Sequence, residues 1–299
     1  MKYRELGHSG CAISEISLGC MSLPSSAKEV QNIIDAALDF GINYFDTADL
    51  YDRGQNEELV GKALKHVRDQ VIIATKVGNR WFEGKEGWQW DASKEYIETA
   101  VKDSLSRLGT DYIDFYQLHG GTMEDELEEV VDVFEKLKKE GLIRHYGISS
   151  IRPNVIRRFL KNGNPSSVMM QYSLLDRRPE EWLTMIQENG ASVVARGSLA
   201  KGLLTAEWTR RLDGDKYLSY SNAELKTTLE NLNGLSAPIH SIALHYVLNQ
   251  SAIASCVTGA SSTEQLAETM NAYNQMVPED ILLRAADLSK TETYQQHRE

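Results

Sequence analysis

Short apolar runs alternate with amphipathic stretches along almost the whole chain. The apolar runs are rich in β-branched and aromatic residues and predict strands at Ile16–Cys20, Ile42–Asp46, Val71–Lys76, Ile113–His119, Ile143–Ser149, Val168–Gln171, Ser192–Arg196 and Ala254–Thr258. The stretches between them predict helices at Glu29–Phe40, Asn56–His66, Ser93–Leu108, Met123–Glu140, Asn154–Lys161, Pro179–Asn189, Pro238–Asn249 and Ser262–Asn271. Eight strand–helix repeats favour parallel strands with crossover helices, so we expect an α/β fold, a (β/α)8 or TIM barrel.

The remaining segments carry signals of their own. The first dozen residues predict a small β-hairpin that covers the bottom of the barrel. The loop Gly78–Asp91 holds three tryptophans and a phenylalanine, so it either closes over an apolar substrate or packs on its own side chains. The connection Gly197–Leu235 is long and rich in polar residues, which suits an irregular flap. The tail after Thr291 is expected to fray.

Composition narrows the class of protein. The chain has 299 residues, of which 41% are hydrophobic, and this predicts a single barrel domain over residues 1–299 with long loops at its C-terminal face. A net charge of -11 makes nucleic acid and anionic membranes poor partners. The N-terminus has no apolar signal core, and we expect a cytoplasmic protein whose three cysteines are reduced thiols.

Four residues with complementary chemistry lie at or just beyond the ends of predicted strands. Asp46, Lys76 and His119 each close a strand, and Tyr51 follows the second strand in the loop TADLY. In a (β/α)8 barrel these side chains would meet at the C-terminal face, where the chemistry of such barrels takes place. Lys76 beside Tyr51 would favour release of the phenol proton, and Asp46 would balance the buried ammonium.

The same four residues form a donor set around one oxygen atom rather than a nucleophile–base pair. A neutral His119 could donate a hydrogen bond to an alkoxide that develops during the reaction. Each residue alone is more often a solvated or structural side chain. Their joint placement at successive strand ends is what indicates a site for transfer of a proton and a hydride.

The chain resembles the aldo-keto reductase family through an ordered set of segments. These are GINYFDTADLYDRGQNEELVGKAL, VIIATKVG, SLSRLGTDYIDFYQLHG, GLIRHYGISS and MMQYSLLDRR, and the likeness runs from the first strand to the last helix. The resemblance implies a (β/α)8 barrel that binds NAD(P)H and reduces aldehydes and ketones. It implies that Tyr51 is the proton donor, that Asp46 and Lys76 tune it, and that His119 orients the carbonyl.

The resemblance also implies cofactor and substrate positions. The cofactor-binding residues would be Gly19, Cys20, Met21, Asp46, Ser149, Ser150, Gln171, Arg196, Gly197, Ser198, Leu199, Lys201, Gly202, Gly259, Ala260, Ser261, Gln265, Glu268 and Thr269. The substrate would contact Tyr51 and His119, and the aromatic loop adds Trp81 and Trp88 as substrate contacts. Together with Phe82 and Trp90, these tryptophans hint at an apolar or aromatic carbonyl compound. Small-molecule carbonyl compounds are the expected partners, and the sequence leaves the oligomeric state open.

Three departures from the family pattern affect the cofactor site. Ser150 stands where the family usually has Asn, which shortens its reach to the carboxamide. Arg196 stands where an aromatic residue commonly lies under the nicotinamide, so its planar guanidinium either stacks on that ring or pairs with an acidic neighbour. The segment GASSTEQ offers Ser261, Ser262 and Gln265 but no cation for a 2′-phosphate. NADP(H) is still favoured through the family resemblance, and NAD(H) remains possible.

Two other kinds of function stay open at this point. The barrel could be a cofactor-binding regulatory or redox-sensing protein with slow turnover, or an aldolase in which Lys76 forms a Schiff base. Fingerprints of other nucleotide and hydrolase folds do not occur in the sequence, and the histidines form no metal-ligand spacing with cysteines. We expect no metal.

Overall fold

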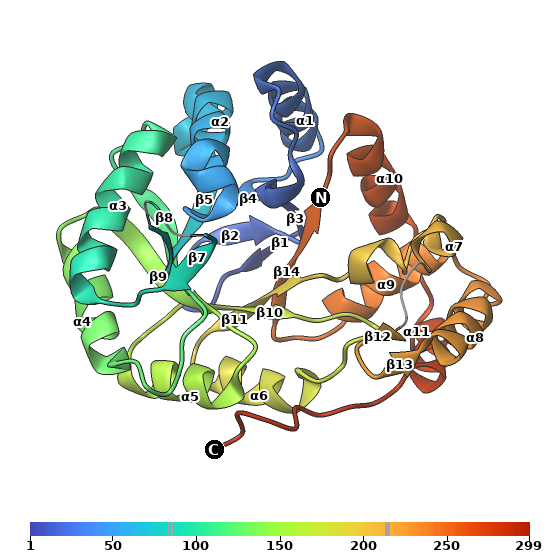
Figure 1. The fold of residues 1–299 in the computed structure, drawn as a ribbon. Coiled ribbons are helices and arrows are strands. Elements are labelled where there is room, and N and C mark those ends of the chain that lie inside the picture. The colour runs from blue at the N-terminus through green and yellow to red at the C-terminus, as the bar shows by residue number, and fades with distance from the viewer. Residues whose placement is uncertain (83, 85, 213–215) are drawn as a thin grey trace.

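The computed structural model describes residues 1–82, 84, 86–212 and 216–299, and it contains a closed barrel of eight parallel strands (Figure 1). These strands are β3 (Ile16–Gly19), β4 (Tyr44–Asp46), β5 (Ile72–Val77), β8 (Ile113–His119), β9 (Ile143–Ser149), β10 (Ser167–Gln171), β11 (Ser192–Arg196) and β14 (Ile253–Gly259). Each pairs in parallel with the next, and β14 pairs with β3 to close the ring. The predicted (β/α)8 barrel is confirmed.

Helices surround the strands, as the amphipathic stretches predict (Figure 1). They are α1 (Ala27–Asp39), α2 (Gln55–Leu64), α3 (Lys94–Leu108), α4 (Leu127–Lys139), α5 (Pro153–Asn162), α6 (Glu180–Glu188), α9 (Ile239–Leu248) and α10 (Thr263–Asn274). Ser26, Ser93 and Ser262 each accept a hydrogen bond from a first-turn amide of α1, α3 or α10. These side chains satisfy N–H groups that the helix itself leaves unpaired, so they fix where the helices begin.

Three further helices were not predicted. They are α7 (Trp208–Arg211), α8 (Asn222–Asn233) and α11 (Glu279–Leu288). The expected irregular flap over 197–235 is therefore wrong in its second half, where α8 begins at a capping box made by Ser221 and Glu224. The expectation of a frayed tail is also wrong, because Tyr294 is buried and Arg298 forms an ion pair with Glu181 at 2.6 Å.

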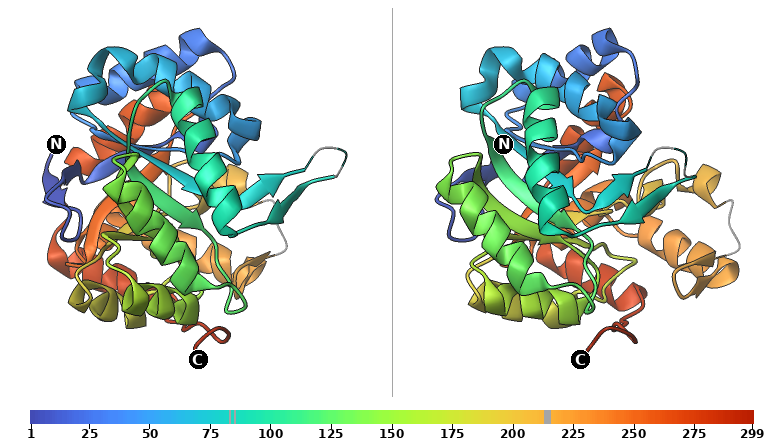
Figure 2. Two further views of the ribbon diagram at one scale, coloured as in Figure 1. Left: turned by 90° about the vertical axis from the view of Figure 1, so that its left-hand side faces the viewer. Right: turned by 60° about the vertical axis from the view of Figure 1, so that its left-hand side comes forward.

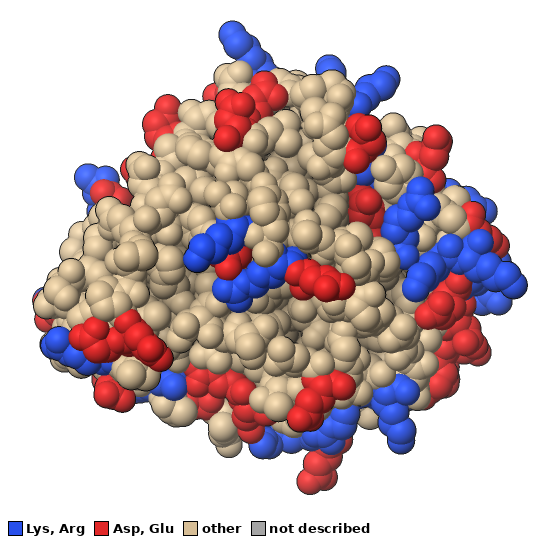
Figure 3. Space-filling model, turned by 180° about the vertical axis from the view of Figure 1, so that it is seen from behind, with Lys and Arg blue, Asp and Glu red and all other residues tan. Residues whose placement is uncertain are grey.

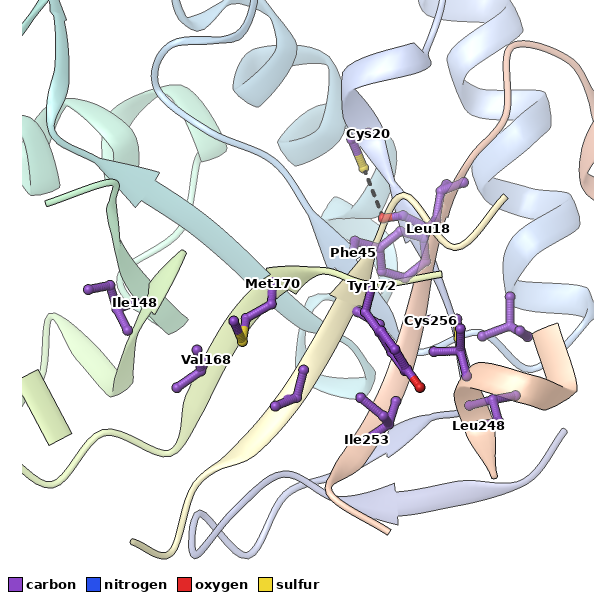
Figure 4. Packing of buried hydrophobic residues seen from close by; sticks show 14 of the residues in the cluster. Leu18, Cys20, Phe45, Ile148, Val168, Met170, Tyr172, Leu248, Ile253 and Cys256 are labelled. Atoms are coloured by element: carbon purple, nitrogen blue, oxygen red, sulfur yellow. Dashed lines mark hydrogen bonds between the residues drawn. The ribbon is translucent and has the colours of Figure 1, made fainter. Parts of the chain in front are cut away.

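The hydrophobic core has two layers. Inside the barrel, Tyr44, Phe115, Met169 and other strand residues pack on Leu6 and Ile13. Both belong to the hairpin of β1 (Tyr3–Glu5) and β2 (Ala12–Ser14), Leu6 in its connection and Ile13 in β2. The outer layer lies between the strands and the helices. Figure 4 shows part of it, where Tyr172 lies near Ile253 and Cys256 of β14.

The two-residue period of the strands determines which side chains reach the mouth of the barrel. Inward positions alternate along each strand, so the residue two places beyond an inward core residue also points inward. The inward core residues Tyr44, Ala74, Phe115, Met169 and Val194 are followed two places later by Asp46, Lys76, Gln117, Gln171 and Arg196. Apolar side chains thus fill the barrel, and polar side chains occupy its C-terminal end.

The two ends of the barrel carry different hairpins (Figure 2). The N-terminal hairpin covers one end, as predicted, and β6 (Asn79–Trp81) and β7 (Trp88–Trp90) form an antiparallel hairpin that projects from the opposite end. The predicted loop Gly78–Asp91 therefore contains ordered strands. Seen from behind, acidic and basic side chains are interspersed over the surface (Figure 3). Among the described residues, no helix is both long and apolar enough to cross a membrane.

Candidate active site

A cavity of about 1080 Å³ opens at the C-terminal end of the barrel, and Asp46, Tyr51, Lys76 and His119 all line it. Three of the four stand at the inward positions of β4, β5 and β8, and Tyr51 follows β4 in the next loop. Because the C-terminal ends of parallel strands meet at one rim, residues far apart in sequence become neighbours. The structure therefore brings together all four residues that the sequence singled out.

Lys76 is the centre of this group. Its side chain is fully buried, and its Nζ donates hydrogen bonds to Asp46 Oδ2 at 2.6 Å and to the Thr47 carbonyl at 2.7 Å. Burial alone would lower the pKa of Lys76, but the charge of Asp46 and the neighbouring Tyr51 raise it above the ordinary value. The ammonium therefore stays protonated at neutral pH, which removes the lone pair that a Schiff-base reaction needs.

Tyr51 lies beside this ammonium. Lys76 Nζ donates to the Tyr51 hydroxyl at 3.4 Å and lies 5.1 Å from the centre of the phenol ring. The next two residues, Asp52 and Arg53, have positive φ angles of 47° and 54°. Non-glycine residues in this region cost about 1 kcal/mol or more each, and such strain concentrates at functional sites. The strained turn presents Tyr51 to the cavity.

His119 completes the group from β8. Its ring lies nearly perpendicular to that of Tyr51, with 6.1 Å between the ring centres. Burial, together with the charges of Lys76 and Arg196, lowers the pKa of His119 to about 3, so the imidazole is neutral. Its Nδ1 is buried and has no partner among the described residues. An unpaired acceptor is better tolerated than an unpaired donor, which favours the tautomer with the proton on Nε2.

A second buried acid lies behind Tyr51. Asp49 accepts a hydrogen bond from the Tyr96 hydroxyl at 3.0 Å, and its other carboxylate oxygen is buried without a partner in the described part of the chain. Burial, and then the charge of the nearby Glu57, raises the pKa of Asp49 to about 7. The folded protein thus holds a proton on Asp49 that the unfolded chain releases at lower pH.

This proton gives a testable pH dependence of stability. Because the pKa of Asp49 is higher in the folded state, its contribution to the free energy of unfolding is intact below pH ~4 and is lost as the pH rises towards 7. Between pH 5 and 8 the loss should be about 3 kcal/mol, at about 1.4 kcal/mol for each pKa unit. Urea unfolding at both pH values should show a smaller loss in Asp49→Asn. The exposed Asp132→Asn should behave as the wild type, and equal pH dependence in all three proteins would contradict the assignment.

Most of the expected cofactor positions line the cavity. They are Gly19, Met21, Asp46, Ser149, Ser150, Gln171, Arg196, Gly197, Ser198, Leu199, Lys201, Gly202, Gly259, Gln265, Glu268 and Thr269. Cys20, Ala260 and Ser261 lie outside the lining. Cys20 is fully buried, and its thiol donates to the Leu18 carbonyl at 3.7 Å (Figure 4). Ala260 is buried, and the Ser261 hydroxyl bonds to Gln265 at 3.0 Å.

Arg196 was expected either to stack on the nicotinamide or to pair with an acidic side chain, and the structure bears on the second alternative. Its Nη1 donates to Gln171 Oε1 at 3.3 Å, and within the described ranges no acidic oxygen forms an ion pair with it. Asp176, the nearest candidate through Gln171, is instead held by Arg178 at 2.7 Å. Arg196 is exposed and lines the cavity.

The aromatic residues of the projecting hairpin divide into two groups. Trp88 lines the cavity, as expected for a substrate contact, and is half exposed. Trp81 does not line it, because its Nε1 donates to the Leu50 carbonyl at 3.2 Å and Arg53 covers its ring. Trp90, another of the loop aromatics that the sequence offered for the substrate, lines the cavity, and its Nε1 donates to Asp125 at 2.8 Å. The hairpin is thus partly a wall of the cavity and partly packed on the barrel.

Several lining residues had no distinct signal in the sequence. They are Leu50, Asn79, Trp90, Gly120, Gly121, Thr122, Ile151, Arg152, Arg211, Tyr217 and His240. Thr122 and Arg152 each lie three residues beyond the end of a predicted strand, so the rule that loops at the C-terminal end build the site could have found them. Tyr217 and His240 come from the long connection and the helix after it, where no local pattern marks a residue as part of the site.

Comparison with known proteins agrees with this geometry. Residues 15–283 match the model of the aldo/keto reductase family. The uncharacterized oxidoreductase YqkF of Bacillus subtilis is 50% identical over 305 residues, covering 100% of both chains. The NADH-specific methylglyoxal reductase of Escherichia coli is 32% identical and covers 92% of this chain and 94% of its own.

A solved structure has a similar level of sequence identity to this chain as the Bacillus subtilis relative. Aldo-keto reductase AKR11C1 from Bacillus halodurans, in its holo form, superimposes with a TM-score of 0.96 and 52% sequence identity, and 100% of each chain is covered. Glycerol dehydrogenase AKR11B4 from Gluconobacter oxydans, at 24% identity and a TM-score of 0.84, shares the fold. The chain therefore belongs to the aldo/keto reductase family, oxidoreductases that use NAD(P)H and reduce carbonyl groups.

Proposed function

We propose that the protein is an NADP(H)-dependent reductase of aldehydes and ketones in which Tyr51 is the general acid. The observation that supports this most directly is the contact between the Tyr51 hydroxyl and the buried, protonated Lys76 at 3.4 Å. A cation beside a phenol stabilises the phenolate that remains after proton transfer. The neutral His119 across the cavity supplies the second donor that a reacting carbonyl oxygen requires.

The residues around the cavity suit a nicotinamide dinucleotide. The turn from Gly197 to Gly202 has positive φ angles at Gly197, Ala200, Lys201 and Gly202, and most of its residues line the cavity. The amides of Ala200 and Gly202 donate to backbone carbonyls within the turn, so other amides of the turn would bind an anion. Lys201 adds an exposed cation to the same turn. These residues would hold the pyrophosphate. Ser149 and Gln171, at the ends of β9 and β10, would hold the carboxamide of the nicotinamide.

The chain's own groups account for the proton. When bound, the nicotinamide supplies the hydride to the carbonyl carbon. His119 would donate its Nε2 proton to the carbonyl oxygen as a hydrogen bond and orient it. Tyr51 would transfer its proton to the same oxygen as negative charge develops there. Lys76 would stabilise the phenolate until it takes up a proton again, and Asp46 would keep Lys76 charged.

A preference for NADP(H) over NAD(H) is part of the proposal. Lys201 and Arg211 both line the cavity, and the side chain of Arg211 lies against Gly202. Cations there can bind the additional phosphate even though Ser261, Ser262 and Gln265 are neutral. The names of relatives point both ways, since one is an NADH-specific reductase and another an NADP(+) aldo-keto reductase. Fluorescence titration with NADPH and NADH should give a lower Kd for NADPH, and equal or reversed values would remove this preference.

Hydride transfer separates the enzyme from a cofactor-binding regulator. With a reactive aldehyde and cofactor deuterated at the transferred position, we expect many turnovers and alcohol that carries the deuterium on its carbinol carbon. Mass spectrometry of the product measures both. Cofactor that binds without multiple turnovers would favour a regulatory or redox-sensing role instead.

Arg196 gives a prediction for cofactor binding. Stacking of the guanidinium on an aromatic ring contributes about 1–2 kcal/mol, so Arg196→Ala should raise the Kd for NADPH about 5- to 30-fold. Fluorescence titration measures this change, and Arg196→Lys should recover little because an ammonium is not planar. The exposed Arg284→Ala is a control for charge, since Arg284 lies on α11 outside the cavity lining. Unchanged affinity in Arg196→Ala would exclude stacking.

A further inference from the structure

Arg152 places a second positive charge at the substrate end of the cavity. It follows β9 and is the residue directly before α5, which starts with Pro153. Its Nη1 donates to the Gly121 carbonyl at 2.5 Å, and its backbone N–H donates to Ser150 Oγ at 3.2 Å. Both anchors belong to residues that also line the cavity, so the guanidinium is held at the cavity wall.

The guanidinium has spare hydrogen-bonding capacity and no counter-ion. Of its five N–H groups, one is used by the Gly121 carbonyl, and among the described residues no carboxylate lies within ion-pair distance of it. Glu124 is close enough for Arg152 to contribute to the lowered pKa of its carboxyl, but it is fully exposed and forms no ion pair with Arg152 in the described ranges. A partly buried cation without a partner in a cavity is suited to an anionic ligand.

The other charges close to Tyr51 and His119 are positive or neutralised by a partner. Asp46 is neutralised by Lys76, and Arg196 is exposed in the cavity without an acidic partner in the described part of the chain. The remaining acidic residues of the lining are Glu207 and Glu268, of which Glu207 pairs with Arg210. The net field around Tyr51 and His119 therefore favours a substrate that carries negative charge.

Arg152 and the proposed catalytic residues share one part of the lining. Gly121, whose carbonyl Arg152 contacts, is two residues beyond His119 at the end of β8. Trp88, Trp90 and Ile151 provide apolar walls for a short carbon chain. We propose that Arg152 binds an anionic group of the substrate, with a carboxylate as the expected group, so that the preferred substrates are short oxo acids. This inference rests on the proposed carbonyl-reductase function and names its substrate class.

Steady-state kinetics with matched aldehydes tests the proposal. We expect the wild type to have a kcat/KM for 4-oxobutanoate about 10- to 100-fold higher than for butanal, the range of one charge-assisted interaction. In Arg152→Gln, which keeps an amide donor but no charge, this ratio should fall towards one. Arg157→Gln is the matched control, because Arg157 lies on α5 outside the cavity lining and its loss changes the net charge equally. Its ratio should stay at the wild-type value.

The outcomes separate this inference from the function on which it rests. Reduction of butanal without any preference for 4-oxobutanoate in the wild type, or a preference that survives in Arg152→Gln, would overturn the role of Arg152 and leave the reductase intact. Turnover of neither aldehyde would overturn both. A gain for glyceraldehyde 3-phosphate over glyceraldehyde that also depends on Arg152 would support the anion site with phosphate as its ligand.

A measurement on the unmodified protein covers the case in which Arg152→Gln does not fold. Butyrate should inhibit butanal reduction by the wild type competitively, at concentrations where the neutral butyramide has little effect. Rising salt should weaken the inhibition by butyrate, because ions screen a partly exposed charge pair. Equal inhibition by butyrate and butyramide would overturn the anion site.

Discussion

Replacing Tyr51 by Phe is expected to lower kcat for aldehyde reduction about 10²- to 10⁴-fold, the range that a positioned general acid contributes. Phenylalanine keeps the ring that packs edge-on to His119, but it removes the hydroxyl to which Lys76 donates. The reacting oxygen would then have to take its proton from water. Steady-state rates of NADPH oxidation with a reactive aldehyde measure the effect.

Binding measurements show whether this loss is chemical. The Kd for NADPH should change little in Tyr51→Phe, because the proposed pyrophosphate and carboxamide contacts come from β9, β10 and the turn at residues 197–202. Trp81→Phe is a useful control, since Trp81 packs near Tyr51 but does not line the cavity. Turnover by Tyr51→Phe at the wild-type rate would exclude Tyr51 as the acid.

Replacing Lys76 by Met should have the largest effect on stability, a loss of about 3–5 kcal/mol in the free energy of unfolding at neutral pH. The methionine fills a similar volume, but Asp46, only 4% exposed, would lose the cation 2.6 Å from its carboxylate. An uncompensated charge in this position is poorly solvated. Urea unfolding measures the loss, which should shrink at low pH because protonated Asp46 needs no counter-ion.

A double-mutant cycle isolates the ion pair from the change in packing. Asp46→Asn together with Lys76→Met removes both charges and should recover part of the stability that Lys76→Met loses. Activity should stay low in the double variant, because the Tyr51 phenolate would have no adjacent cation. If the double variant were less stable than Lys76→Met by the full cost of Asp46→Asn alone, the two side chains would not be coupled.

The order of the strands and the convergence of Asp46, Tyr51, Lys76 and His119 on one cavity could be predicted from the sequence alone. The periods of strands and helices are local signals in the sequence. Eight strand–helix repeats are typical of a sheet that closes into a (β/α)8 barrel. Once the strands are parallel, their C-terminal ends must meet, so Asp46, Lys76 and His119 converge whatever the details of packing. The resemblance to a family supplied the role of Tyr51, which the pattern of apolar residues does not define.

Contacts between segments distant in sequence were decided only by the tertiary structure. Trp88 and Trp90 line the cavity, whereas Trp81 donates to the Leu50 carbonyl, although all three belong to one hairpin and look alike in the sequence. Arg152 became a cavity residue because its guanidinium reaches the Gly121 carbonyl 31 positions away. Local sequence patterns carry no information about contacts between residues that are distant in the sequence. These contacts stabilise the protein only after the barrel has closed and water has been excluded from its mouth.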